Sequence, residues 1–161
     1  MCEPDTRSAA ATRVQMALKS LGITSANVKE MPESTRTAKD AASAIGCKVA
    51  EIAKSLVFRT VESNRPILII ASGVNRVNEG EFARTLGERI ERASPEFVRE
   101  KTGFVIGGVA PVAHSEPIQT WMDASLFGFE RIWAAAGTPN AVFEIAPAEL
   151  KRITDASIVT L

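Results

Sequence analysis

Hydrophobic and polar positions along the chain predict five short helices. Each helix has apolar residues at helical spacing and a polar or proline residue that favours its start. Asp5 or Thr6 can cap the first helix, and Thr37 opens the second with a capping box in which Asp40 replaces the usual Glu. Glycines can end most of these segments. The predicted helices cover residues 6–21, 37–45, 78–86, 94–102 and 147–153.

The strand signals predict a sheet of about seven strands. Segments 55–62 and 66–72 are joined by a polar turn, Ser63-Asn64-Arg65, and form a hairpin. Residues 67–71 are apolar on both faces, which predicts a central strand. Because strands and helices do not alternate regularly, we expect a mixed α/β domain and not a doubly wound sheet. The other predicted strands are 104–106, 120–123, 131–135, 141–145 and 157–160.

Composition and charge fit one folded domain over residues 1–161. The chain is 45% hydrophobic and 24% charged, and it has no internal repeat, linker or charge block. With 19 basic and 19 acidic residues, the net charge is zero, so bulk charge does not attract nucleic acid. Between residues 36 and 76, however, seven basic residues face three acidic ones. Contact with RNA must therefore be local; solvated surface charge is the ordinary alternative.

Several classes of site are excluded by the residues that the chain lacks. Cys2 and Cys47 cannot build a disulfide framework and form no CxxC pair. The single histidine, His114, rules out an HExxH zinc site and multi-histidine metal clusters. No signal peptide and no membrane-spanning run is apparent. We expect a protein of the reducing cytoplasm that uses no metal and no cofactor and binds neither membrane nor DNA.

Lys54 is the first candidate for chemistry. It lies where an apolar turn, residues 49–53, gives way to a strand. Its ammonium could hold a phosphate or polarise a carbonyl. The local sequence alone favours a different interpretation, in which the aliphatic stem covers the sheet edge and the charged end stays in water.

Two glycine-containing loops are the next candidates. Gly107-Gly108 precedes Pro111 and His114, and paired glycines can expose backbone N–H groups to an oxyanion. The segment Gly137-Thr138-Pro139-Asn140 offers a hydroxyl and an amide between two strands. Taken alone, each loop is better explained as an ordinary tight turn.

Three single residues complete the candidates. Ser72 follows the central strand and could face a ligand, or could belong to a simple Ser-Gly turn. Asp123 could anchor an amine or hydroxyl, although an aspartate at the end of a strand more often caps the next turn. His114 is more typical of a locally bonded loop histidine than of a general base.

Taken in order, these segments resemble the YbaK/EbsC family of trans-acting aminoacyl-tRNA deacylases, whose domain also occurs as the editing insertion of bacterial prolyl-tRNA synthetases. The resemblance spans about residues 37–161. The order and spacing of the motifs carry it, not any one of them. They are Lys54-Ser55-Leu56-Val57-Phe58, residues 102–111 with Gly107-Gly108, Asp123 after Thr120-Trp121-Met122, and Ala136-Gly137-Thr138-Pro139-Asn140.

The resemblance implies a curved, barrel-like mixed sheet and hydrolysis of the ester that joins a wrong amino acid to the end of a tRNA. It implies that Lys54 is the essential lysine and that Gly107 and Gly108 contact the aminoacyl carbonyl. Pro111 would rigidify the loop, Asp123 and the segment from Gly137 to Asn140 would shape the pocket, and Ser72 would lie at its rim. His114 is expected among the same substrate-binding residues. An aminoacyl ester is already activated, so positioning and oxyanion stabilisation suffice without a protein nucleophile.

The same resemblance implies a substrate and partners. The expected substrate is proline tRNA carrying alanine or another small amino acid, bound by its aminoacylated 3' end. Because a lone deacylase of this size makes few contacts with tRNA, we expect prolyl-tRNA synthetase or an elongation factor to deliver it. Family members often have proline at the position of Ala110, so this loop is expected to be less rigid.

Two alternatives stay open at the level of the sequence. One is a catalytically silent module that binds a tRNA end or a synthetase. The other is a small-molecule ester hydrolase with Cys47 or Ser55 as its nucleophile, although no base lies near either residue in the sequence.

Overall fold

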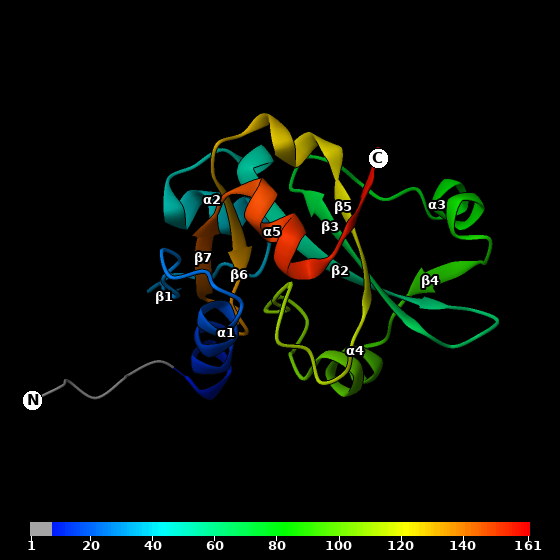
Figure 1. The fold of residues 1–161 in the computed structure, drawn as a ribbon, viewed down its shortest axis with the longest axis horizontal. Coiled ribbons are helices and arrows are strands. Elements are labelled where there is room, and N and C mark those ends of the chain that lie inside the picture. Colours follow the sequence, from blue (N-terminus) through cyan, green and yellow to red (C-terminus); the bar gives the residue numbers. More distant parts are fainter. Residues whose placement is uncertain (1–7) are drawn as a thin grey trace, which may run out of the picture.

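The computed structural model describes residues 8–161, which form an eight-stranded mixed sheet with five α-helices around it (Figure 1). Two short 3-10 helices, η1 and η2, lie in the connections. The elements in chain order are α1 (Ala9–Ser20), β1 (Lys29–Glu30), α2 (Ala38–Ile45), η1 (Val49–Glu51), β2 (Ile52–Thr60), β3 (Pro66–Ser72), α3 (Glu79–Leu86), β4 (Ile90–Arg92), α4 (Pro95–Thr102), β5 (Gln119–Asp123), η2 (Ala124–Gly128), β6 (Ile132–Ala135), β7 (Ala141–Ile145), α5 (Pro147–Thr154) and β8 (Ser157–Val159).

The predicted helices are confirmed, with most of their caps. Thr37 Oγ1 accepts a hydrogen bond from the Asp40 backbone N–H at 3.0 Å, and Asn78 and Ser94 cap α3 and α4 in the same way. The first helix begins at Ala9 behind the cap Ser8. The proposed caps Asp5 and Thr6 lie outside the described residues.

The sheet runs in the order β1-β7-β6-β2-β3-β5-β8, and β4 pairs with the outer edge of β2. β2 and β3 form the predicted antiparallel hairpin, while β3 pairs with β5 in parallel. Its edge strands β1 and β8 do not pair with each other in the described part of the chain, so the sheet is curved but not closed. β3 is central as predicted, and each side chain from Ile67 to Ala71 has 0% of its surface exposed.

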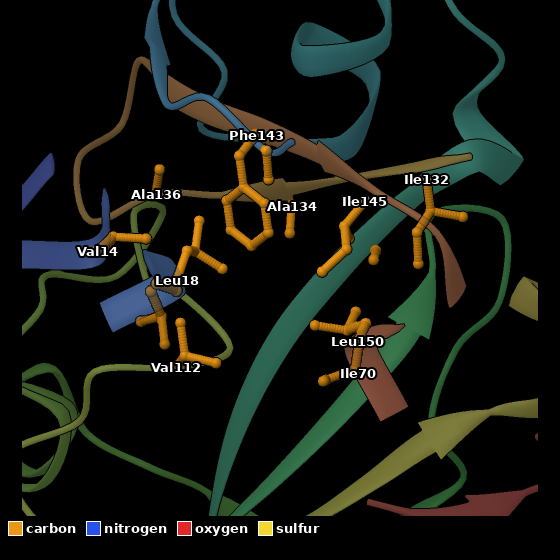
Figure 2. Packing of buried hydrophobic residues seen from close by; sticks show 14 of the residues in the cluster. Val14, Leu18, Ile70, Val112, Ile132, Ala134, Ala136, Phe143, Ile145 and Leu150 are labelled. Atoms are coloured by element: carbon orange, nitrogen blue, oxygen red, sulfur yellow. The ribbon is translucent and has the colours of Figure 1, made fainter. Parts of the chain in front are cut away.

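Two apolar clusters cover the two faces of the hairpin. Leu68 and Ile70 point into the large core that α1 and α5 close, as Figure 2 shows for Ile70 with Leu18 and Leu150. Ile67 and Ile69 point to the other face and pack in the cluster of Phe82 and Trp121, whose rings meet edge to face at 5.0 Å. Alternation along β3 therefore supplies both cores.

The strand predictions need correction in four places. Residues 104–106 are not a strand: Phe104 is buried under the Arg13 guanidinium, and a tight turn follows it. β1 and β4 were missed because two or three residues are too short for a periodic signal. β2 begins at Ile52, earlier than expected, so that Lys54 lies within the strand.

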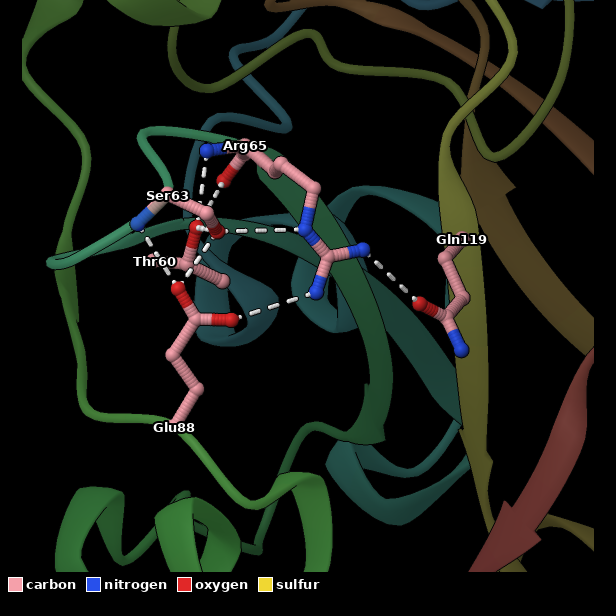
Figure 3. Close-up of polar contacts among 5 residues, drawn as sticks. All are labelled: Thr60, Ser63, Arg65, Glu88 and Gln119. Atoms are coloured by element: carbon pink, nitrogen blue, oxygen red, sulfur yellow. Dashed lines mark hydrogen bonds and ion pairs between the residues drawn. The ribbon is translucent and has the colours of Figure 1, made fainter.

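A polar network ties the tip of the hairpin to the rest of the molecule (Figure 3). Arg65 contacts Glu88 at 3.3 Å and Gln119 at 3.4 Å, while the Ser63 N–H donates to Glu88 at 2.8 Å. Thr60 Oγ1 accepts from the Arg65 N–H at 2.7 Å. The hairpin is thus fastened to the segment before β4 and to β5.

None of the helices in residues 8–161 combines the length and apolar character needed to cross a bilayer.

Candidate functional site

A cavity of about 400 Å³ lies against the outer edge of β2. This volume falls within the range of about 300–1,000 Å³ that is typical of small-ligand sites. Its walls come from β2, the segment before α2, the loop that contains Gly107, and β6. The cavity exists because β2 pairs with β6 only at Ile52 and Ala53 and with β4 only from Phe58 to Thr60, which leaves the edge between them uncovered.

Three cationic side chains line this cavity: Lys54, Arg36 and Arg92. Lys54 is partly buried, whereas the two arginines are exposed and stand at the mouth. Burial lowers the pKa of Lys54, and the nearby charges of Arg76 and Arg92 lower it further. No aspartate or glutamate is among the described residues that line the cavity. The arrangement suits an anion such as a phosphate.

Asp123 is the one acidic group that opposes the lowered pKa of Lys54. Lys54 pairs with Ala71 across β2 and β3, and Asp123 stands one residue beyond the last β3–β5 pair, Ile70 with Met122. The residues at positions 54, 71 and 123 therefore form a row on one face of the sheet. This row places the Asp123 carboxylate behind Lys54 and not in the cavity.

The Asp123 carboxylate is fully buried and accepts three hydrogen bonds. Its donors are the Ser72 N–H at 2.9 Å, Asn75 Nδ2 at 2.8 Å and the Ser125 N–H at 2.9 Å. The Ser72 hydroxyl donates to the Ala50 carbonyl at 2.7 Å. Neither residue lines the cavity, so their contacts are those of a capped turn, which is the ordinary interpretation of an aspartate at a strand end.

Gly107 lines the cavity and occupies the third position of the turn Val105–Gly108, which the Gly108 N–H closes by donating to the Val105 carbonyl at 3.0 Å. Its φ of +90° is the conformation that a type II turn requires at that position, and glycine adopts it without strain. Arg36 packs over it so closely that a Cβ at position 107 would come within 2.5 Å of Arg36 Cγ. This turn therefore positions an arginine at the mouth.

Gly108 has a different function from Gly107. Its N–H is used within the turn, so the expected backbone contact to a substrate carbonyl is not available from this amide. Instead Gly108 packs on the backbone of Thr138, and its carbonyl accepts from the Gly137 N–H at 2.9 Å. It joins the two glycine loops.

The segment Gly137-Thr138-Pro139-Asn140 stands behind the cavity and does not line it. The Pro139 carbonyl accepts from the Thr35 N–H at 2.7 Å, and Asn140 makes two hydrogen bonds with the backbone of Met31. Residues 35–37 form a wall of the cavity, so the hydrogen bond to Thr35 makes this loop a support of that wall.

Pro111 and His114 lie elsewhere, along a second, more open depression. His114 Nε2 is 2.7 Å from the Ala110 carbonyl, so the ring holds the loop from behind. Burial lowers the pKa of His114, against the effect of that carbonyl and with a smaller contribution from Arg13. His114 therefore does not line the cavity that contains Lys54.

The alternative nucleophiles find no base. Cys47 packs in the small apolar cluster of Ile52 and Trp133 and does not line the cavity; burial and Glu51 raise its pKa. Ser55 does line the cavity, but its hydroxyl has no hydrogen-bond partner within residues 8–161. In the same part of the chain, no group of three or more His, Cys, Asp or Glu side chains could hold a metal ion.

Sequence reasoning missed Arg92 and Trp133 as cavity residues and did not single out Arg36. Arg92 comes from β4, a strand too short to predict, and Trp133 from β6, whose face could not be assigned without its partners. The one available signal was the excess of basic residues around Lys54, which includes Arg36.

Comparisons with known proteins show what the chain is similar to. A family model of the aminoacyl-tRNA editing domain matches residues 32–153. The uncharacterized protein YwhH of Bacillus subtilis is 35% identical over 128 residues, which are 80% of this chain and 81% of that protein. A proline–tRNA ligase of Limosilactobacillus fermentum is 28% identical over 114 residues, 68% of this chain but 20% of the ligase.

A solved structure extends the likeness to almost the whole chain. It is described as a candidate trans-editing enzyme for prolyl tRNA synthetase, is 46% identical, and superposes with a TM-score of 0.91 over 97% of this chain and 98% of that one. The family model covers most of the chain and includes Lys54, both glycine loops and Asp123. The protein therefore belongs to the aminoacyl-tRNA editing domain family.

Proposed function

We propose that this protein is a trans-acting deacylase that hydrolyses the ester of mischarged tRNA, with proline tRNA carrying alanine or another small amino acid as its substrate. The observation that carries the proposal is the cavity at the edge of β2, where Lys54, Arg36 and Arg92 stand without a lining carboxylate among the described residues. An anionic RNA end matches the three cationic side chains of this cavity, and a small acyl group matches its apolar walls. Membership of the editing-domain family supports the reaction class.

Lys54 is the central residue of the proposed mechanism. Its ammonium would hold the terminal phosphate or the ester carbonyl, and Arg36 and Arg92 would add positive charge at the mouth. The Gly107 N–H has no partner within residues 8–161 and would donate to the carbonyl oxygen as it becomes negative. Water attacks the carbonyl carbon, the tetrahedral intermediate collapses, and the ribose oxygen leaves as a hydroxyl.

The reaction needs no protein nucleophile because the ester is already activated. The chemistry that remains for the protein is orientation and stabilisation of the oxyanion. The absence of a base beside Ser55 or Cys47 within the described residues is consistent with this mechanism. The water would be activated by the substrate's own neighbouring hydroxyl.

The choice of a small acyl group follows from the inner walls of the cavity. Ala134 and Val57 line it on the side of the large core, and Ala135, Trp133 and Phe58 also line it and limit its extent. Apolar walls of this kind discriminate by size, by roughly 10–200-fold per methylene. We further propose that the protein acts in the cytoplasm and receives its substrate from prolyl-tRNA synthetase or an elongation factor, since a net charge of zero gives no bulk attraction to the tRNA body.

The test is release of the amino acid from proline tRNA charged separately with alanine, cysteine, serine and proline. Wild type is expected to release one non-cognate residue rapidly, and Lys54→Ala to lose at least about 100-fold of that rate. Lys19→Ala, which removes an exposed lysine on α1, is the matched control and should keep full activity. If no residue is released above the spontaneous rate while tRNA still binds, the protein is a silent binding module and the proposal fails.

A further inference from the structure

The backbone of β2 alternates in direction, and the hydrogen bonds show which residues face β3. The Ile52 carbonyl accepts from the Gly73 N–H at 2.8 Å, and the Thr60 N–H donates to the Arg65 carbonyl at 2.9 Å. In an antiparallel pair, the N–H and C=O of one residue point to the same side and those of the next residue to the other. The even-numbered residues of β2, Lys54 included, therefore direct their backbone groups to β3.

The odd-numbered residues direct theirs to the outer edge. The Val57 carbonyl accepts from the Ala93 N–H at 3.4 Å, and beyond the strand the Val61 N–H donates to the Arg89 carbonyl at 2.9 Å. Ser55 belongs to this set. It lies in the gap after the β6 pairs end at Ala53 and before the β4 pairs begin at Phe58. Its N–H and C=O thus point toward the cavity and not toward a neighbouring strand.

The side chain of Ser55 adds a second observation. Among residues 8–161, its hydroxyl is the one buried side-chain N or O atom without a hydrogen-bond partner. An unpaired buried hydroxyl is costly to a fold, and native proteins keep few of them. Ser55 also lines the cavity. Backbone and side chain together therefore offer one donor, one carbonyl acceptor and one hydroxyl at a single place.

Lys54 and Ser55 flank the gap from opposite faces of the sheet. Ser55 shares its face with Ala53 and Val57, which pack in the large core, and Lys54 shares the other face with Leu56. The cavity reaches both because it lies at an uncovered edge. The cation can thus hold one part of a bound molecule while Ser55 holds another.

We propose that the aminoacyl group of the substrate pairs with Ser55 as a strand of a single residue. The Ser55 N–H donates to the acyl carbonyl, its C=O accepts from the α-amino group, and its hydroxyl accepts a second hydrogen from that amine. An aminoacyl group has the same sequence of atoms as a residue in a strand, and strand addition at a free edge is a common mode of recognition. This inference rests on the proposed function and names the part of the substrate that the site reads.

The charges at the site are compatible with an amine held by neutral groups. Lys54, Arg36 and Arg92 line the cavity, and no described carboxylate lines it. Nearby positive charge favours the uncharged form of an amine. A neutral α-amino group keeps two N–H donors, which match the carbonyl and the hydroxyl of Ser55. Recognition of this kind does not depend on the amino-acid side chain.

The test compares an aminoacyl ester with its analogue that lacks the α-amino group, alanyl with propionyl on the same tRNA. The analogue removes the amine and adds no bulk. Rates are expressed relative to spontaneous hydrolysis of each ester, because the amine itself activates the ester. Wild type should lose roughly tenfold or more in kcat/KM on the propionyl ester, since two hydrogen bonds disappear.

Ser55→Ala should weaken this discrimination severalfold, mainly by raising KM for the alanyl ester, and Ser55→Thr, which keeps the hydroxyl, should restore it. Ser157→Ala on β8 is the control. Because the hydroxyl is unpaired in the free protein, Ser55→Ala should unfold at an unchanged or higher urea concentration, whereas a purely structural serine would give a lower one.

The outcomes separate the two proposals. If wild type hydrolyses neither ester, the proposed function fails. If it hydrolyses the alanyl ester but Ser55→Ala shows the same discrimination as wild type, the function stands and the pairing with Ser55 is overturned. Loss of stability in Ser55→Ala with unchanged discrimination would overturn it as well.

Discussion

Gly108→Ala is the sharpest test of how the two glycine loops build the cavity. A Cβ at position 108 would lie 2.6 Å from the carbonyl carbon, 2.7 Å from the Cα and 2.9 Å from the nitrogen of Thr138. All three are backbone atoms, so no side-chain rotation can relieve the contact. The loop that contains Gly137 must move away, and the 2.9 Å hydrogen bond from the Gly137 N–H to the Gly108 carbonyl is strained or lost.

The magnitude follows from these two effects. Overpacking costs about 1–3 kcal/mol, and the lost hydrogen bond adds about 0.5–1.5 kcal/mol. The expected loss in the free energy of unfolding is thus about 2–4 kcal/mol, which for a chain of this size lowers Tm by about 4–16 °C. Gly108 joins the turn of Gly107 to the loop 137–140, which supports cavity residues 35–37. The deacylation rate should therefore fall as well.

The assay is thermal or urea unfolding, with Gly128→Ala as the control. Gly128 ends η2 and has no positive φ, and a Cβ added there would meet no heavy atom within 4 Å, so its substitution should change Tm little. If Gly108→Ala unfolds like wild type, the close contact between the loops is wrong. If Gly108→Ala is destabilised yet fully active at low temperature, the two glycine loops do not position the cavity residues that the reaction needs.

The remaining predictions concern charge. Arg92→Gln removes a positive charge that lowers the pKa of Lys54, so the alkaline limb of the deacylation rate should move to higher pH. Asp123→Asn removes the opposing carboxylate, so the alkaline limb should move to lower pH. The free energy of unfolding should fall by about 2–4 kcal/mol, because buried hydrogen bonds to a charged group weaken. Alkaline limbs that stay unchanged in both variants would show that Lys54 does not set the rate. Burial lowers the pKa of His114 from 6.5, so the unfolded chain binds this proton more tightly than the folded protein does. The stability that the neutral residue contributes is therefore complete above about pH 6.5, and it falls as the pH drops through the folded-state pKa. His114→Gln should flatten the acid limb of urea stability, and an equally steep limb in this variant would contradict the assignment.

Local signals in the sequence were sufficient for most elements. The caps Thr37, Asn78 and Ser94 and the apolar run from Ile67 to Ala71 act within a few residues, so helices and the central strand could be read directly. Residues 104–106 were predicted as a strand because a run of three apolar residues is too short for periodicity to distinguish a strand from a loop that contains the buried Phe104. Its burial comes from α1, which is distant in sequence.

The residues of the site also differ in how much the sequence alone could say about them. At Lys54 and Gly107 the local sequence alone favoured ordinary interpretations, and only the family resemblance joined the two residues in one site. Both line the cavity. Asp123 and the loop from Gly137 to Asn140 were expected to shape the pocket, but neither is among the residues that line the cavity. His114 lies along a separate depression. Their contact with a substrate stays a prediction. A polar residue in a loop looks the same in sequence whether it faces a ligand or another loop.

By itself the sequence determined the presence of the helices, the hairpin, the central strand and the cationic region around Lys54, because each depends on neighbours along the chain. Only the tertiary structure decided that β6 and β4 leave the edge of β2 uncovered at Ser55, that Arg92 joins the mouth, and that Gly108 fastens two loops. These features depend on pairing between segments far apart in the chain. Strand partners are selected by the packing of the whole sheet, and no local pattern encodes where a partner is missing.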